Sequence, residues 1–427
     1  MQTFTAKQYL MLDIASNYGL DKESWDARLD WFKTVEGIIT QAEDLNKSPI
    51  FRALNKEAEE PALFYAGCVA YRTAIKGLPI TYPISLDATA SGAQLLAVLI
   101  GCEKSGSLCN VVDTGNREDL YTNVYNLMRD ILASGDFGFV KGDDAVVDGT
   151  NGITRSDAKQ AVMTSLYGST AKPKEVFGEG ERLDAFYQVM NEQAPGIWDL
   201  NQSLLSLADP EATSYSWTLP DNFHVNVKVM NTIEEPITFL GETYMVPRKV
   251  QAPVDNDLSL GANTTHSVDG MVVREMERRC YYDFNKITDV TMMLKSGLYE
   301  PKSSMDREHD QLVMTLWDNY LQSGFLSSRI LELLDVENLW WVDRHVVLDM
   351  IETLPKKPFP VITVHDCFRV HPNYGNDLRR QYNQILSEIA RSNLLQFIVN
   401  QISKDQLTVE KYGDLTDSVL VANYALS

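Results

Sequence analysis

The sequence predicts an α+β protein that is mostly helical and contains a small antiparallel sheet. Long segments carry apolar residues at helical spacing, and 24–42, 61–74 and 378–402 are the clearest of them. Two short β-branched segments lie far apart in the chain, at 78–86 and 359–370. The second consists of two apolar runs around a His-Asp pair, which is typical of a tight hairpin with polar residues at its tip.

The elements can be justified in chain order. Residues 1–80 are mostly helical by periodicity, and the strand at 78–86 ends at Asp87. Small residues and an apolar run then predict a turn and a helix over 88–101. Thr154 is an N-cap residue type with Asp157 three positions later, so a helix is expected to begin there. The remaining expected elements are a helix at 119–132, a Gly/Asp-rich loop at 136–152, a β-hairpin formed by 223–229 and 236–246, and helices at 305–334 and 337–354.

Composition and charge limit the possible functions. Of 427 residues, 44% are hydrophobic and 23% are charged, an ordinary globular balance that excludes disorder and collagen-like repeats. The longest apolar run, 95–102, is far too short to cross a membrane. Five scattered cysteines form neither a disulfide framework nor a zinc motif. The 38 basic and 59 acidic residues give a net charge of −21, so nucleic-acid binding requires a local basic groove, a divalent metal or a basic partner.

Three segments could carry chemistry, at 85–94, 154–168 and 364–368. In the second, Arg155, Lys159, Met163 and Tyr167 recur every four residues, so each lies only about 40° round the helix from the last. Such a stripe suits a nucleoside triphosphate, with cations for the phosphates and an aromatic ring for the sugar or base. Two carboxylates on neighbouring strands could hold two divalent cations for displacement at phosphorus.

In this order, the three segments resemble motifs A, B and C of the phage-type single-subunit RNA polymerases. Asp87-x3-Ser91-Gly92-x-Gln94 is similar to the family's motif A, and Thr154 to Gly168 is similar to its motif B. The resemblance implies a right-hand palm and fingers fold. It spans most of the chain and includes Asn110, the Asp-Leu-Tyr at 119–121, the His-Ser-x-Asp-Gly at 266–270, the His-Asp at 365–366 and the terminal Asn-Tyr-Ala-Leu-Ser at 423–427.

The resemblance also implies roles for individual residues around a two-metal site. Asp87 and Asp366 would bind two Mg²⁺ ions, helped by the carbonyl of Ala88, and His365 would flank the metal site. Arg155 and Lys159 would hold the incoming triphosphate, and Lys159 would donate a proton to the pyrophosphate leaving group. Tyr167 and His266 would favour a 2′-hydroxyl, while Gly168 and Tyr121 would lie near the base or the template.

The expected activity is DNA-directed RNA synthesis from ribonucleoside triphosphates. DNA polymerases of the same superfamily carry a Glu in motif A that crowds the 2′ position, and this chain has no Glu there. Two alternatives remain open: a DNA polymerase or primase of the superfamily, and a polymerase-like subunit that binds nucleic acid without catalysis. A comparison of ribonucleotide and deoxyribonucleotide incorporation distinguishes the RNA polymerase from the first alternative. The effect of substituting Asp366 on nucleotide addition distinguishes it from the second.

The chain is about half the family's usual length and resembles the larger, catalytic subunit of a heterodimeric phage RNA polymerase. The thumb and the N-terminal domain have no counterpart in it, so a second subunit is expected to supply them. The other expected partners are a DNA template, the nascent RNA and a single-stranded-DNA-binding or loading protein, in the cytoplasm of an infected bacterium and without a membrane. The expected divisions are palm at 1–109, fingers at 110–270, an inserted helical subdomain at 271–355 and palm again at 356–427.

The predicted hairpin at 223–246 corresponds in position to the family's promoter-specificity loop. Glu234 and Glu235 are expected near its tip, where they would repel phosphates, so independent promoter recognition is not expected.

Overall fold

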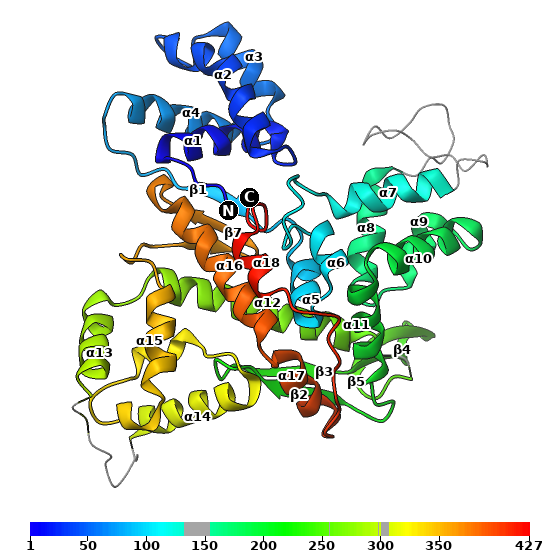
Figure 1. Ribbon diagram of the computed structural model, residues 1–427. Coiled ribbons are helices and arrows are strands. Elements are labelled where there is room, and N and C mark those ends of the chain that lie inside the picture. Colours follow the sequence, from blue (N-terminus) through cyan, green and yellow to red (C-terminus); the bar gives the residue numbers. More distant parts are fainter. Residues whose placement is uncertain (132–153, 256, 298, 300–306) are drawn as a thin grey trace.

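A three-stranded antiparallel sheet lies at the centre of the fold and joins the two ends of the chain (Figure 1). The computed structural model describes residues 1–131, 154–255, 257–297, 299 and 307–427, so the loop expected at 136–152 lies outside it. The strands are β1 (Ile84–Asp87), β6 (Ile362–Val364) and β7 (Cys367–Val370), in the order β1-β7-β6. The register pairs Ile84 with Val370 and Asp87 with Cys367. With helices covering most of the remaining described chain, this sheet confirms the α+β class.

The N-terminal residues form a helical layer beside β1, drawn in blue at the top of Figure 1. It consists of α1 (Ala6–Ala15), the π-helical turn η1 (Ser16–Leu20), α2 (Trp25–Gln41), α3 (Pro49–Glu57) and α4 (Pro61–Ile75). Thr5 begins α1 with a capping box that includes Gln8, and Ser24 and Ser48 accept N-cap hydrogen bonds at α2 and α3. Tyr71 and Phe32 pack edge to face within this layer and are fully buried.

Three helices pack together behind the central sheet. They are α5 (Ser91–Ile100), α12 (Ser259–Cys280) and α16 (Gly375–Arg391), and α6 (Glu103–Leu108), α17 (Leu394–Ser403) and α18 (Thr416–Val421) surround them. Every residue of α5 is buried, which explains its continuous apolar run. Inside this core, the Tyr382 hydroxyl donates to Gln94 Oε1 at 2.7 Å. Gln94 Nε2 in turn donates to the carbonyl oxygens of Cys109 and Ala425, so α5 is tied to the residue that follows α6 and to the C-terminal segment.

A second lobe, drawn in cyan and green at the right of Figure 1, carries the predicted helix at 154–168. It contains α7 (Leu120–Ile131), α8 (Arg155–Ser165), α9 (Ala171–Phe177), α10 (Glu181–Gln193) and α11 (Pro195–Ser206). Thr154 and Asp157 form a capping box, which confirms the predicted start of α8. The helix ends at Ser165, so Tyr167 and Gly168 lie in the following turn, where Gly168 has φ +87°.

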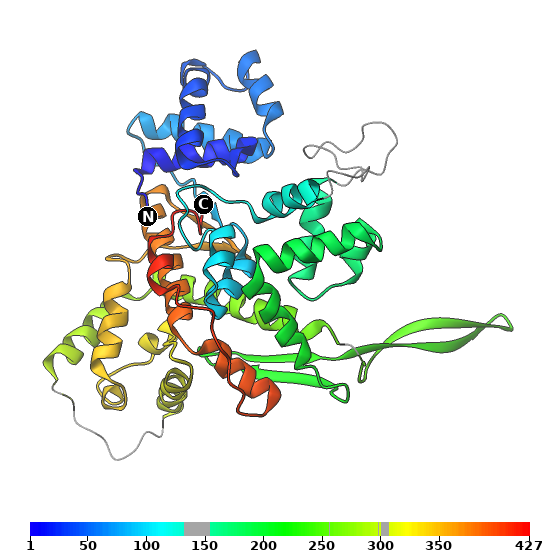
Figure 2. The same ribbon diagram turned by 45° about the vertical axis from the view of Figure 1, so that its right-hand side comes forward.

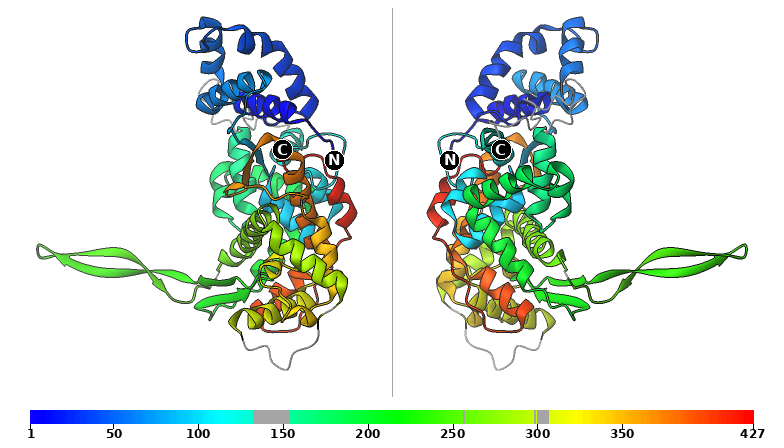
Figure 3. Two further views of the ribbon diagram at one scale, coloured as in Figure 1. Left: turned by 90° about the vertical axis from the view of Figure 1, so that its left-hand side faces the viewer. Right: turned by 90° about the vertical axis from the view of Figure 1, so that its right-hand side faces the viewer.

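The predicted pairing of 223–229 with 236–246 is wrong. Instead, β2 (Ser214–Thr218) pairs with β3 (His224–Lys228), and β4 (Met230–Phe239) pairs with β5 (Glu242–Gln251) in a long arm that projects from the molecule (Figures 2 and 3). Leu240 and Gly241 close the arm with positive φ angles. Glu234 and Glu235 therefore lie in mid-strand rather than at the tip. The alternation of apolar and polar residues did not predict the strand pairing, because both faces of the arm are exposed to solvent.

Residues beyond α12 form a helical subdomain with its own hydrophobic core, at the lower left of Figure 1. Its elements are α13 (Phe284–Ser296), α14 (Glu308–Ser323), η2 (Ser328–Glu332), η3 (Leu339–Trp341) and α15 (Arg344–Thr353). The boundary expected at residue 270 falls inside α12, and this separate core begins at Ile287. The single helix expected at 305–334 ends at Ser323, because Gly324 has φ +71° and starts a turn.

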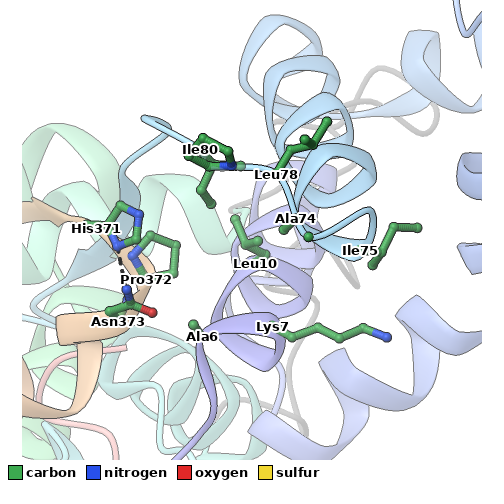
Figure 4. Close-up of a pocket in the computed structure, with 12 residues that line it drawn as sticks. Ala6, Lys7, Leu10, Ala74, Ile75, Leu78, Ile80, His371, Pro372 and Asn373 are labelled. Carbon is green, nitrogen blue, oxygen red and sulfur yellow. Dashed lines mark hydrogen bonds between the residues drawn. The ribbon is translucent and has the colours of Figure 1, made fainter.

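None of the helices in the described part of the chain has the length and apolarity that a bilayer crossing requires. A cavity of about 540 Å³ lies between α1, the end of α4 and the short turn η4 (Pro372–Tyr374). Figure 4 shows that Leu10, Ile80 and Pro372 make it largely apolar. The turn η4 comes shortly after Val370, the last residue of β7. The cavity therefore lies at the end of the central sheet opposite to Asp87.

Candidate active site

Two carboxylates meet at one end of the central sheet. Asp87 is the last residue of β1, and Asp366 lies in the two-residue turn between β6 and β7. The amide of Ala88 donates to the carbonyl of Asp366 at 3.1 Å, so the two acidic residues lie on adjoining segments. The pKa of Asp87 is raised, first because protein atoms exclude water from part of its carboxylate and further because Asp366 carries a like charge. The sheet therefore concentrates negative charge at this end.

The open edge of β1 is held by groups from both ends of the chain. The buried carboxylate of Asp13 accepts from the amide of Ser85 at 2.8 Å and from the Tyr82 hydroxyl at 2.7 Å. Two residues further on, Asp87 exchanges backbone hydrogen bonds with Ser427. An edge strand needs such partners for its outward amides, and they fix the backbone that carries Asp87. Asp13 was not among the predicted site residues, and its signal in the sequence is an acid inside an otherwise apolar helical segment.

His365 links the carboxylate pair to α12. Its Nδ1 lies 3.2 Å from Asp366 Oδ1, and its Nε2 lies 3.8 Å from Asp269 Oδ2. The hydrogen bond to Asp366 raises the pKa of His365, while burial raises the pKa of Asp269 to about 6. His365 has φ 57°, a positive value that suits the first position of a two-residue hairpin turn. Asp269 belongs to the motif at 266–270, but no individual role was predicted for it.

Tyr167 lies where three of the predicted motifs meet. Its ring centroid is 4.7 Å from that of His266, and a methyl group built on Gly92 would lie only 2.3 Å from its hydroxyl oxygen. Burial raises the pKa of Tyr167 to about 12, and the charges of Asp269 and Asp366 act in the same direction. The phenol is therefore neutral near pH 7 and can donate a hydrogen bond. Gly92 is required because a larger residue would displace the hydroxyl.

The two cations predicted to hold a triphosphate have different surroundings. Arg155 forms an ion pair with Asp119 and donates from Nε to Thr122 Oγ1 at 2.6 Å. Despite the opposing effect of burial, this pairing lowers the pKa of Asp119. Lys159 is exposed, and its ammonium nitrogen lies 5.4 Å from the centroid of the Tyr121 ring. Lys159 is thus open to an anion, whereas Arg155 would have to share or exchange Asp119.

Gly168 lies beside this site but makes a packing contact. A methyl group there would come within 2.9 Å of Leu205 on α11. The glycine also borders a cavity of about 830 Å³ lined by Tyr187 and Trp198. Its predicted place near the base or template stays a prediction.

The donor set fits a hard divalent cation. Asp87, Asp366 and the carbonyl of Ala88 offer oxygen ligands, which Mg²⁺ prefers. Within the described ranges no cluster of three or more His, Cys, Asp or Glu side chains could hold a metal ion. A pair of carboxylates agrees with the usual mode of Mg²⁺ binding, in which water and substrate phosphates complete the coordination. The assignment of Mg²⁺ ligands therefore stays a prediction that the residues fit.

Part of this chain is similar to a known protein family. Residues 4–192 match the family model described as DNA-dependent RNA polymerase. This region includes Asp87, Arg155, Lys159 and Tyr167, and it ends before His266 and Asp366.

Individual relatives extend the similarity. A probable DNA-directed RNA polymerase of Neurospora crassa is 30% identical over 169 residues, which cover 38% of this chain and 18% of the relative. T7 RNA polymerase of Escherichia phage T7 is 22% identical over 342 residues, 62% of this chain and 38% of the relative. A probable DNA-directed RNA polymerase of Gelasinospora sp. (strain G114) is 22% identical over 419 residues, 90% of this chain and 43% of the relative. The chain thus spans less than half the length of these relatives, and the matches support a relationship with the phage-type RNA polymerases.

Proposed function

We propose that this chain is the catalytic part of a DNA-dependent RNA polymerase. The observation that carries the proposal is the register of the central sheet, which puts Asp87 and Asp366 at one end on adjoining segments. Tyr167 contacts His266 and lies within reach of the charge of Asp366. Lys159 lies over the ring of Tyr121, on which the charge of Asp366 also acts. Relatives named as DNA-directed RNA polymerases support the same reading at low identity.

The chemistry would need two Mg²⁺ ions, held by Asp87, Asp366 and the Ala88 carbonyl, to neutralise phosphate charge and to activate the attacking 3′-hydroxyl. Lys159 would bind the triphosphate of the incoming ribonucleotide and donate a proton to the leaving pyrophosphate. Arg155 would add a second phosphate contact by sharing its charge with Asp119.

Selection of ribonucleotides would depend on Tyr167. Its neutral phenol can donate to a 2′-hydroxyl, and the ring of His266 holds it in place. Burial and the nearby charge of His365 lower the pKa of His266, so its imidazole is uncharged near pH 7 and can accept or donate one hydrogen bond. A site built around such a hydrogen bond rejects a substrate that lacks the hydroxyl.

The matched regions cover less than half of each of these relatives, which favours a working polymerase that contains further protein. We propose a second, basic polypeptide that supplies the thumb and N-terminal part and completes the nucleic-acid channel. The net charge of −21 favours a basic partner over an acidic one. A single-stranded-DNA-binding or loading protein would bring this complex to DNA, and the phage relatives favour the cytoplasm of an infected bacterium as its place of action.

The test is extension of an RNA primer annealed to single-stranded DNA, with ribonucleotides or deoxyribonucleotides, with and without co-purified partners. Asp366→Asn should abolish nucleotide addition while binding of the primer–template, followed by fluorescence anisotropy, stays unchanged. Asp318→Asn, an exposed position on α14, is the matched control and should extend normally. Undiminished extension by the Asp366 variant would contradict the proposal, and preference for deoxyribonucleotides would indicate a DNA polymerase.

A further inference from the structure

Asn110 is a buried residue whose side chain joins two separate segments of the chain. The residue is only 4% exposed, and its φ of 64° is one that asparagine adopts more readily than most residues. Its Nδ2 donates to Thr89 Oγ1 at 3.1 Å and to the carbonyl of Glu118 at 2.9 Å, and its Oδ1 accepts from the amide of Glu118 at 2.8 Å. Both amide protons and the oxygen are used, so the side chain is held in a single orientation. These three hydrogen bonds are called the Asn110 bridge below.

The Thr89 end of the bridge lies beside an expected metal ligand. Thr89 follows Asp87 by two residues and lies outside the helices and strands. Its hydroxyl donates to the carbonyl of Cys109 at 3.2 Å and accepts from Gln94 Nε2 at 2.9 Å. With the bond from Asn110, these contacts fix the turn through which the chain leaves β1.

The Glu118 end of the bridge holds the start of α7, which carries the partners of both expected phosphate ligands. Asp119 directly follows Glu118 and forms the ion pair with Arg155. The ring of Tyr121, two residues further on, lies 5.4 Å from the ammonium nitrogen of Lys159. A displacement at Glu118 would therefore be passed on to both cations.

The position of the bridge in the fold explains why it would matter for catalysis. The lobe that contains α7 and α8 packs on α5, α6 and α12 mainly through α11. Helices α7 and α8 instead pack on each other and on α9 and α10. The Asn110 bridge thus ties the α7 end of the lobe to the turn after β1. Phosphoryl transfer depends on the placement of the triphosphate relative to the metal ligands, and a misplacement of 1 Å can cost about 100-fold in rate.

We propose that Asn110 is a positioning residue that holds the triphosphate-binding cations of α8 in register with the metal-binding end of β1. It acts through Thr89 on one side and through Asp119 and Tyr121 on the other, without touching the substrate. The inference rests on the proposed function, because it requires these two groups of side chains to act on one nucleotide.

The experiment measures kcat and KM for ribonucleotides in RNA primer extension by the polymerase together with its co-purified partners. Asn110→Asp keeps the shape of the side chain and the oxygen that faces the amide of Glu118, but it removes both donors. It should lower kcat by about 10- to 100-fold and change KM by less than about threefold, because the cations still bind the triphosphate but hold it in the wrong place.

The other end of the bridge can be tested in the same way. Thr89→Val removes the hydroxyl and should also lower kcat, whereas Thr89→Ser retains the hydroxyl and should restore most of it. The double variant of Asn110→Asp and Thr89→Val should lose less than the product of the two single losses, since both substitutions remove one shared hydrogen bond.

Asn338 provides a matched control in the helical subdomain. This buried amide donates to Asp310 Oδ1 at 3.1 Å and to the carbonyl of Leu333 at 3.0 Å, and it accepts from the amide of Asp335 at 2.8 Å. Asn338→Asp removes the same two donors, so it should lower the midpoint of thermal unfolding and leave kcat unaltered.

A merely structural role for Asn110 would lower stability in both variants without a selective effect on kcat. An unchanged kcat in Asn110→Asp, a rise in KM alone, or an equal loss of kcat in Asn338→Asp overturns the inference. If Asn110→Asp shows no cooperative unfolding, the comparison of Thr89→Val with Thr89→Ser decides alone. Extension that survives in Asp366→Asn would contradict the proposed function, whereas an inactive Asp366→Asn beside a normal Asn110→Asp would contradict only this inference.

Discussion

The contact between Gly92 and Tyr167 makes a sharp prediction for the substitution Gly92→Ala. A methyl group at Gly92 would lie 2.3 Å from the Tyr167 hydroxyl oxygen and 3.0 Å from Cζ, whereas ordinary contacts begin at 3.4 Å. The hydroxyl must therefore move by about 1 Å. Because Tyr167 is expected to touch the substrate sugar, such a displacement should cost roughly 100-fold in the rate of ribonucleotide addition.

Stability should respond very differently from activity. Alanine is favoured over glycine in a helix by up to about 1 kcal/mol, and this gain offsets part of the cost of about 1–3 kcal/mol for crowding a packed site. The free energy of unfolding should thus change by no more than about 1–2 kcal/mol. Gly37→Ala is the matched control, since its methyl group on α2 would find the nearest atom at 3.7 Å.

The assay is single-nucleotide extension of an RNA primer with each ribonucleotide, together with urea unfolding of both variants. Gly92→Ala should be folded and nearly inactive, and Gly37→Ala should be active and slightly more stable. Normal extension by Gly92→Ala would refute the reasoning, because the hydroxyl would then have no need of its observed place. A large loss of stability would show that the contact serves packing instead.

Three further changes test other parts of the structure. Tyr167→Phe should reduce the preference for ribonucleotides over deoxyribonucleotides by about tenfold or more in competition assays, and an unchanged ratio would remove the phenol from sugar selection. Glu275→Gln should lower the free energy of unfolding by about 3 kcal/mol, because the fully buried Glu275 pairs with Arg279 and accepts hydrogen bonds from Ser327 and Ser328. The control Glu352→Gln, at an exposed position, should leave the free energy of unfolding unchanged. Burial raises the pKa of Asp13 from 3.8 to about 6, so folding favours its protonated form and this group makes the protein less stable as pH rises from 4 to 6. Asp13→Asn should remove up to about 3 kcal/mol of that dependence in metal-free urea titrations, and an identical pH profile would contradict it.

Local sequence patterns were sufficient for much of the fold. The N-cap at Thr154, the hairpin around His365-Asp366 and the apolar helix after Asp87 each depend on residues that are neighbours in the chain. The sequence patterns did not predict the strand pairing of the β4–β5 arm or the domain boundary near residue 270. The exposed arm of β4 and β5 has no buried face and hence no alternation, and α12 crosses the expected domain boundary because its helical pattern continues past residue 270.

The sequence by itself determined which residues could carry chemistry: the acids at 87 and 366, the cations at 155 and 159, and the phenol at 167. Only the tertiary structure decided what surrounds them. It paired Arg155 with Asp119, set Gly92 against Tyr167, and brought Asp13 to the strand that carries Asp87. The physical reason is that residue type and spacing fix local conformation, whereas the charge and space around a side chain depend on strand register and helix packing between residues far apart in the chain.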